Sequence, residues 1–118
     1  MNGQEIKKIR EDLAISQAAF AHILRVSLST LTRWETDRGK PDAETEKNLE
    51  GLSQLLNKEG VEKKKVQEKI ETMGIAHAIA LAAASGLIFL PTIAVFTRIL
   101  GPAAVGLASL FIKEKKHK

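Results

Sequence analysis

Apolar side chains recur at helical spacing through the first half of the chain. Charged and polar residues occupy the positions between them, which is the pattern of short amphipathic helices. Ser16 and Ser27 are suited to begin the second and third helices, because a serine hydroxyl can accept a hydrogen bond from a free backbone N–H. The pattern predicts four helices, over residues 4–13, around 19–24, and over 28–35 and 44–57.

Helices this short are marginal alone, so each needs the apolar faces of the others. Trp34 shares a stripe with Leu31 and is assigned to the core, whereas Glu35 is expected to serve as an ion-pair or cap partner. The predicted core consists of Ile6, Ile9, Leu13, Phe20, Ile23, Leu24, Val26, Leu31, Trp34, Leu49 and Leu52.

A charged connector follows. In residues 58–73, apolar side chains return at helical spacing among lysines and glutamates, which predicts a fifth helix. Two interpretations are open: a solvated spacer, or a short contact between two copies of the chain.

The tail has a different character. Residues 74–97 contain no Asp, Glu, Lys or Arg, and in residues 74–112 the single charge is Arg98. Gly74, Ala78, Ala82 and Gly86 follow one another at intervals of four, which places small residues on one helix face, as in close-packed membrane helices.

The tail permits two main arrangements. In the first, the tail enters the membrane, either as a single span or as a hairpin of segments 74–90 and 92–112 that turns near Pro91. The lysines on both flanks would then lie in the cytoplasm or contact anionic lipid. Alternatively, helices over 75–90 and 92–111 bury each other in a soluble oligomer. The tail has no Trp or Tyr for an interfacial belt, which weakens the membrane interpretation. A pore-forming tail is a third option.

The formal charge of +4 belongs entirely to the tail: residues 1–73 carry 13 basic and 13 acidic side chains, and residues 74–118 carry five and one. The chain has no cysteine and three widely separated histidines, and it lacks known catalytic or nucleotide-binding motifs. We therefore expect no enzyme, no metal and no cofactor. The N-terminus lacks the apolar core of a signal peptide, which favours the cytoplasm.

The most specific pattern lies in residues 16–35, where Ser16-Gln17, Phe20-Ala21, Val26-Ser27 and Arg33-Trp34-Glu35 follow in order. This pattern resembles the Cro- and phage-repressor-type helix-turn-helix family, also called the xenobiotic response element family. The resemblance covers residues 3–57 and includes Gly39-Lys40-Pro41 after the third helix.

The resemblance implies that the third helix enters the major groove of DNA with its N-terminal turn leading. Arg33 would grip guanine with two hydrogen bonds, and Leu28 would contact a thymine methyl group. The net charge of residues 25–40 is +2 and that of residues 41–60 is −3, which would turn one face towards DNA. The implied base contacts are Leu28, Ser29, Thr32 and Arg33, and the implied phosphate contacts are Gln17, Arg38 and Lys40.

The sequence thus predicts an all-α protein: a DNA-binding domain (1–58), a helical linker (59–73), an apolar two-helix tail (74–112) and a basic C-terminus (113–118). The expected function is sequence-specific transcriptional regulation by a homodimer on double-stranded DNA. The tail would either oligomerise it or anchor it, through lipid or a membrane protein, at the cytoplasmic face of the membrane. The alternatives are a membrane-associated assembly protein that uses the same fold to bind proteins, and an antitoxin-like regulator.

Overall fold

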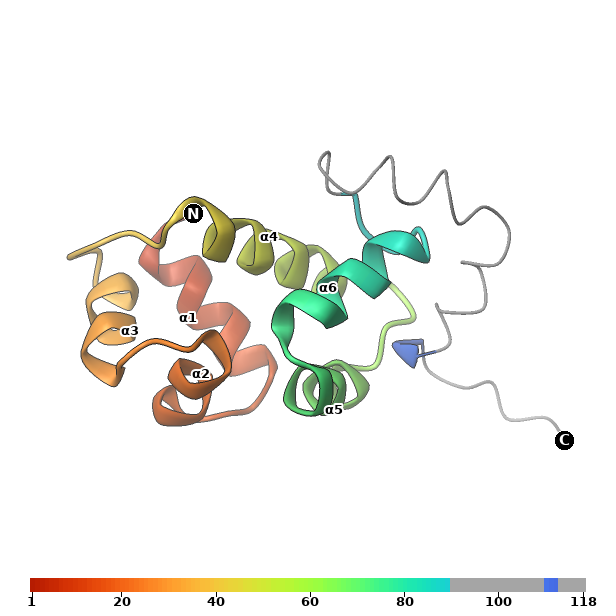
Figure 1. Ribbon diagram of the computed structural model, residues 1–118, viewed down its shortest axis with the longest axis horizontal. Helices are drawn as coiled ribbons and strands as arrows, with labels where there is room; N and C mark the ends of the chain where they lie inside the picture. The colour runs from red at the N-terminus through yellow and green to blue at the C-terminus, as the bar shows by residue number, and fades with distance from the viewer. Residues whose placement is uncertain (90–109, 113–118) are drawn as a thin grey trace, which may run out of the picture.

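The computed structural model describes residues 1–89 and 110–112 (Figure 1). These residues form helices joined by short turns, and their one β contact is an isolated antiparallel bridge between Val61 and Ile112. The four helices predicted in the first half are confirmed to within two residues at their ends. The helices are α1 (Gly3–Asp12), α2 (Gln17–Leu24), α3 (Leu28–Glu35), α4 (Ala43–Asn57), α5 (Lys63–Met73) and α6 (Ile75–Ala84).

The serine caps predicted from the sequence are confirmed. The hydroxyl oxygen of Ser16 accepts a hydrogen bond from the N–H of Ala19 at 3.1 Å, and that of Ser27 accepts one from the N–H of Thr30 at 3.1 Å. Each cap satisfies a backbone donor that has no partner inside the helix. The starts of α2 and α3 are therefore fixed by local sequence.

One apolar core contains residues from all six helices. Nine of the eleven predicted core residues are buried, and Ile23 and Val26 are partly buried against the same cluster. The core extends well beyond the predicted set. The larger side chains that extend it are Leu55, Leu56, Val66, Ile70, Ile75, Ile79, Ile88 and Phe111.

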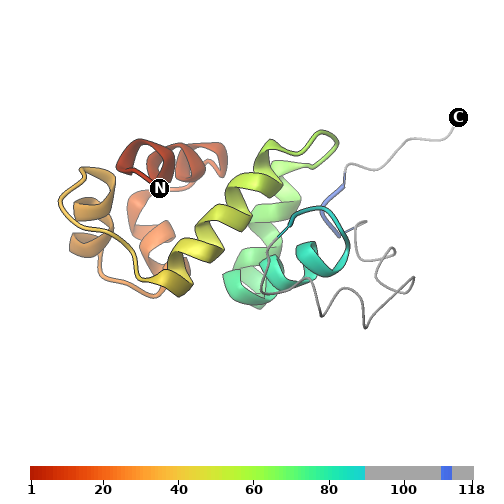
Figure 2. The ribbon, with the colours of Figure 1, turned by 90° about the horizontal axis from the view of Figure 1, so that it is seen from above.

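Helix α4 joins the two halves of the molecule. It packs on α1 on one side and on α6 on the other, while α5 packs mainly on α6. In both ribbon views α4 runs through the middle, with α1–α3 at one end and α5 and α6 at the other (Figures 1 and 2). The face of α3 that would bind DNA is therefore far from the C-terminal helices.

Helix α5 confirms the predicted fifth helix, but the solvated-spacer interpretation is wrong. Val66 is fully buried and Ile70 is 2% exposed, so the connector belongs to the folded core. Because these two side chains pack inside the core of their own chain, they are not available for the contact between two copies that their spacing suggested. Lys63 also ties α5 to α1, through an ion pair of 3.3 Å with Asp12.

The first tail helix is shorter than predicted. It ends at Ala84 instead of residue 90, because the chain turns at Ser85 and Gly86 has a left-handed φ of 84°. Ala78 and Ala82, members of the stripe of small residues, are fully buried in the protein core. Close packing within the protein therefore explains these two alanines, whereas Gly74 and Gly86 lie at the ends of the helix with positive φ, where a β-carbon would meet nothing within 4 Å.

Among the described residues, none of the helices has the length and apolar composition needed to cross a bilayer. The second predicted tail helix and Arg98 lie outside the described residues, apart from 110–112, and so does the basic C-terminus. Phe111 is fully buried, and its carbonyl accepts a hydrogen bond from the N–H of Glu62 at 2.9 Å.

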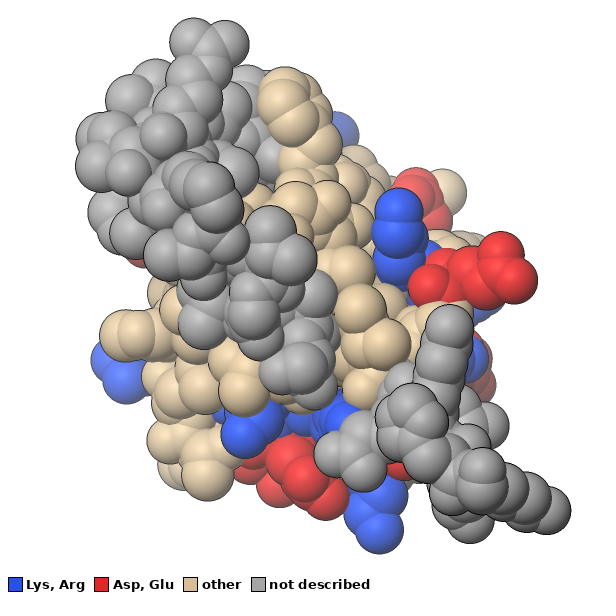
Figure 3. Space-filling model, turned by 90° about the vertical axis from the view of Figure 1, so that its right-hand side faces the viewer, with Lys and Arg blue, Asp and Glu red and all other residues tan. Residues whose placement is uncertain are grey.

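The face that the molecule presents at its α5–α6 end carries charges of both signs in its described part (Figure 3). Figure 3 shows lysine and arginine side chains interspersed with acidic ones around an uncharged area. This mixture differs from the net positive segment around α3.

Candidate nucleic-acid interface

Helix α3 has one buried and one exposed face. Leu31 is fully buried and Trp34 is 7% exposed, so both anchor the helix in the core. The opposite face is open to solvent at the end of the molecule (Figure 1). Leu28 is 49% exposed, so its apolar side chain is accessible on this face. The exposed face contains the four residues predicted to meet bases: Leu28, Ser29, Thr32 and Arg33.

The turn before α3 sets its direction. Arg25 ends α2 in the left-handed conformation, with φ 60° and ψ 41°, and the N–H of Val26 donates to the carbonyl of Ala21 at 3.0 Å. A left-handed backbone costs about 1–2 kcal/mol at a residue other than glycine. The surrounding packing therefore holds a strained turn, and α3 leaves α2 at a fixed angle.

A buried charge cluster joins the first three helices. The guanidinium group of Arg10 in α1 donates to both carboxylate oxygens of Glu35 in α3, from Nε at 2.9 Å and from Nη2 at 3.1 Å. The side-chain amide of Gln17 in α2 donates to Glu35 Oε1 at 3.0 Å. The Glu35 side chain is 3% exposed, and its hydrogen bond raises the pKa of Arg10 above the ordinary value. The expected ion-pair role of Glu35 is confirmed.

Two features of this cluster differ from what the sequence suggested. Arg10 is not among the predicted functional residues, although its position next to Ile9, at the edge of the apolar stripe of α1, is a signal for a partly buried charge. Gln17 was predicted to contact phosphate, and its amide is already bonded to Glu35. One amide hydrogen is left for that contact, which stays a prediction.

The N-terminus of α1 rests directly on the C-terminus of α3. The N–H of Gly3 donates to Asp37 Oδ1 at 2.8 Å. A β-carbon on Gly3 would lie 2.4 Å from the carbonyl oxygen of Glu35, so no other residue fits there without movement. Opposite ends of two helix dipoles meet at this contact, which is favourable.

The predicted phosphate-binding cations surround the end of α3. Arg38 and Lys40 are exposed in the loop that follows α3. A β-carbon on Gly39 would lie 3.6 Å from Arg33 Nη2, so the guanidinium group of Arg33 lies beside the same loop. Three cations are thus gathered next to the exposed face of α3. No group of three or more potential metal ligands occurs in the described part of the chain.

Comparison with known proteins agrees with this geometry. The family model described as helix-turn-helix matches residues 6–63. Neither the curated proteins nor the solved structures include a match. The matched segment contains the capped α2–α3 pair, the exposed face of α3 and the buried charge cluster. The chain therefore carries, at residues 6–63, a helix-turn-helix domain of the Cro- and repressor-type (xenobiotic response element) family.

Proposed function

We propose that this protein is a sequence-specific DNA-binding transcriptional regulator. The observation that carries the proposal is the exposed face of α3, with Leu28 49% exposed, on a helix whose other face is held by Leu31, Trp34 and Glu35. A rigid helix with an open N-terminal turn is the element that such domains insert into the major groove.

The side chains on this face differ in what they can recognise. Arg33 offers two parallel donors, which match the two acceptors of guanine, and Leu28 offers an apolar surface suited to a thymine methyl group. The hydroxyl of Thr32 already donates to the carbonyl of Leu28 at 2.9 Å. Thr32 therefore presents an acceptor and a methyl group to DNA, while the Ser29 hydroxyl can donate or accept.

Backbone contacts would supply affinity without sequence preference. Arg38 and Lys40 lie beside the C-terminal end of α3, and Gln17 lies at the N-terminus of α2, where backbone N–H groups favour an anion. One such domain reads few base pairs, so we propose that two copies bind half-sites about 34 Å apart. The burial of α6 and Phe111 in the core supports a structural role for these parts of the tail.

The test is DNA binding by the full chain, measured by fluorescence anisotropy on duplexes selected from a random pool and on an unrelated duplex. We expect the affinity to fall steeply with salt. Arg33→Ala should weaken binding to the selected duplex by about 1–3 kcal/mol and reduce discrimination, whereas Lys40→Ala should weaken both duplexes alike.

Lys64→Ala is the matched control, because Lys64 is an exposed lysine on α5 in the half of the molecule away from α3. It should leave both affinities unchanged. Failure to detect binding to any duplex at low salt would overturn the proposal in favour of a protein-binding role for the fold. Equal losses on both duplexes from Arg33→Ala would show that Arg33 does not read bases.

A further inference from the structure

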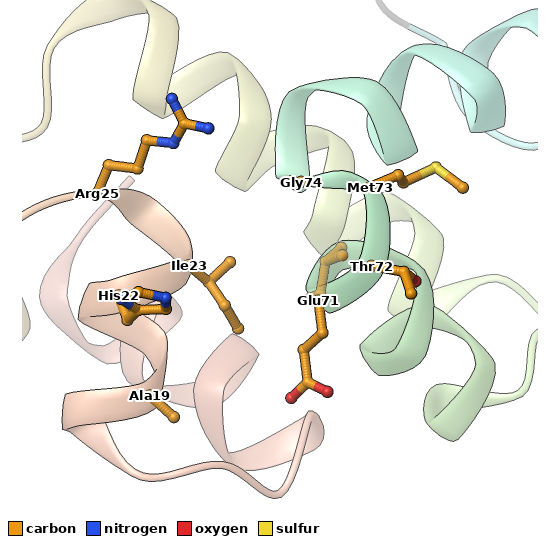
Figure 4. A pocket seen from close by; sticks show the side chains of 9 residues that line it. Ala19, His22, Ile23, Arg25, Glu71, Thr72, Met73 and Gly74 are labelled. Carbon is orange, nitrogen blue, oxygen red and sulfur yellow. The ribbon is translucent and has the colours of Figure 1, made fainter.

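A groove separates α2 from the C-terminal end of α5. Its volume is about 480 Å³, and it continues into a second hollow of about 410 Å³ towards the starts of α4 and α6. The two hollows share Ile23, Arg25, Met73 and Gly74 in their walls. Figure 4 shows the first hollow between the helix-turn-helix unit and the α5–α6 junction.

Small residues and backbone geometry keep this groove open. Helix α2 packs mainly on α3, and α5 packs mainly on α6, so the groove lies between two pairs of helices. Ala19 contributes one methyl group to the wall. Gly74 joins α5 to α6 with a φ of 87°, and a β-carbon there would meet nothing within 4 Å. The groove is thus a consequence of the fold.

The first hollow has an apolar side and one carboxylate, that of Glu71, in its wall. Ile23 points into the space from α2, and Glu71 points into it from the opposite wall (Figure 4). In the described part of the chain, the hydrogen bond found at Glu71 is from the amide of Gln67, at 3.4 Å, and no ion pair reaches the carboxylate. The guanidinium group of Arg25 points away from Glu71 (Figure 4).

We propose that this groove binds a small organic cation whose apolar body is about the size of one aromatic ring. A pocket of 480 Å³ is within the range of small-molecule sites, about 300–1,000 Å³. Ile23 would contact the apolar body, and the ammonium group would pair with Glu71. His22 and Arg25 also line the groove, and the guanidinium group of Arg25 is directed away from the Glu71 carboxylate (Figure 4).

The test uses the full chain without DNA, so its outcome is independent of the proposed function. Phenethylamine is the probe, and 3-phenylpropanoate is the comparator with the opposite charge and the same ring. Binding is followed by amide chemical shifts in ¹⁵N-labelled protein. We expect saturable shifts at Ala19, Glu71 and Gly74 with phenethylamine, and weaker binding of 3-phenylpropanoate.

Two variants locate the site. Ala19→Leu fills the groove and should remove saturable binding, while Ala18→Leu, on the exposed neighbouring residue, should leave it unchanged. Glu71→Gln should weaken phenethylamine by about two- to fivefold, the range of a partly exposed ion pair. Glu71→Lys, at an exposed position that does not threaten folding, should reverse the preference between the two probes.

Three results would overturn the proposal. One is equal affinity for the two probes in the unaltered protein. Another is unchanged phenethylamine binding in the folded Ala19→Leu or Glu71→Lys variant. The third is the absence of any saturable shift at groove residues.

Discussion

Among single residues, Glu35 illustrates how a charge can be buried without loss of the fold. Its carboxylate, 3% exposed, accepts two hydrogen bonds from Arg10 and one from Gln17. Moving an ion out of water costs several kcal/mol, and here three donors from α1 and α2 offset that cost. The carboxylate belongs to the last residue of α3, so its hydrogen bonds hold α3 to both α1 and α2.

Arg10→Met should therefore destabilise the protein by about 3 kcal/mol, because it leaves the Glu35 carboxylate buried without its main partner. Urea denaturation, followed by the fluorescence of Trp34, measures this loss. Lys8→Met is the control, since Lys8 is 64% exposed in its ion pair with Asp12 and should contribute about 1 kcal/mol or less. Equal losses from the two changes would show that the buried ion pair contributes no more to stability than the exposed one. Replacing both Arg10 and Glu35 by methionine should recover part of the loss.

At the scale of helices, the close contact between α1 and α3 depends on Gly3, which has no side chain. Gly3→Ala would place a β-carbon 2.4 Å from the carbonyl oxygen of Glu35, so one helix must move. We expect a loss of about 1–3 kcal/mol in the free energy of unfolding, the usual cost of overpacking. Gln4→Ala, at the exposed next residue, should change stability by no more than about 0.5 kcal/mol. A stable Gly3→Ala protein would contradict the tight contact.

A second link between helices depends on pH. The hydrogen bond from Lys8 and the charge of Lys63 in α5 lower the pKa of Asp12 below its ordinary value. The ionised form is thus favoured in the folded state, so its stabilisation is complete above the ordinary carboxyl pKa and is lost as the pH falls through the lower folded value. The stability advantage over Asp12→Asn should be constant above about pH 5 and shrink towards about pH 3. Denaturation at several pH values tests this, and an advantage that grows on acidification would refute it.

The helices differ in how far the sequence predicts them. The starts of α2 and α3 follow from Ser16 and Ser27, because capping is a local interaction. The cluster of Arg10, Gln17 and Glu35 joins residues up to 25 positions apart, and no local pattern specifies that approach. The stripe in α6 was ambiguous for another reason: small apolar residues pack closely against helices in protein and in membrane alike, so composition does not identify the surroundings.

At the scale of the whole molecule, the question is whether the C-terminal helices are a separate unit. The sequence predicts a domain boundary near residue 58, and that division stays a prediction. The burial of Leu52 and Leu55 in α4 together with Val66, Ile79 and Phe111 places both halves in one cluster. If that cluster unfolds cooperatively, a destabilising substitution at its C-terminal end must also lower the stability of α3, on the far side of α4.

Phe111→Ala tests this cooperativity, because Phe111 is fully buried and its removal from a core costs about 3–5 kcal/mol. Trp34 is the single tryptophan and the chain has no tyrosine, so fluorescence reports on α3 alone while circular dichroism reports on all helices. We expect both probes to shift together to lower urea concentration. Phe89→Ala, at a residue 65% exposed, should change little and serves as the control. A Trp34 transition that stays in place while the helical signal is lost earlier would instead establish two independent units, with the DNA-binding unit stable without the tail.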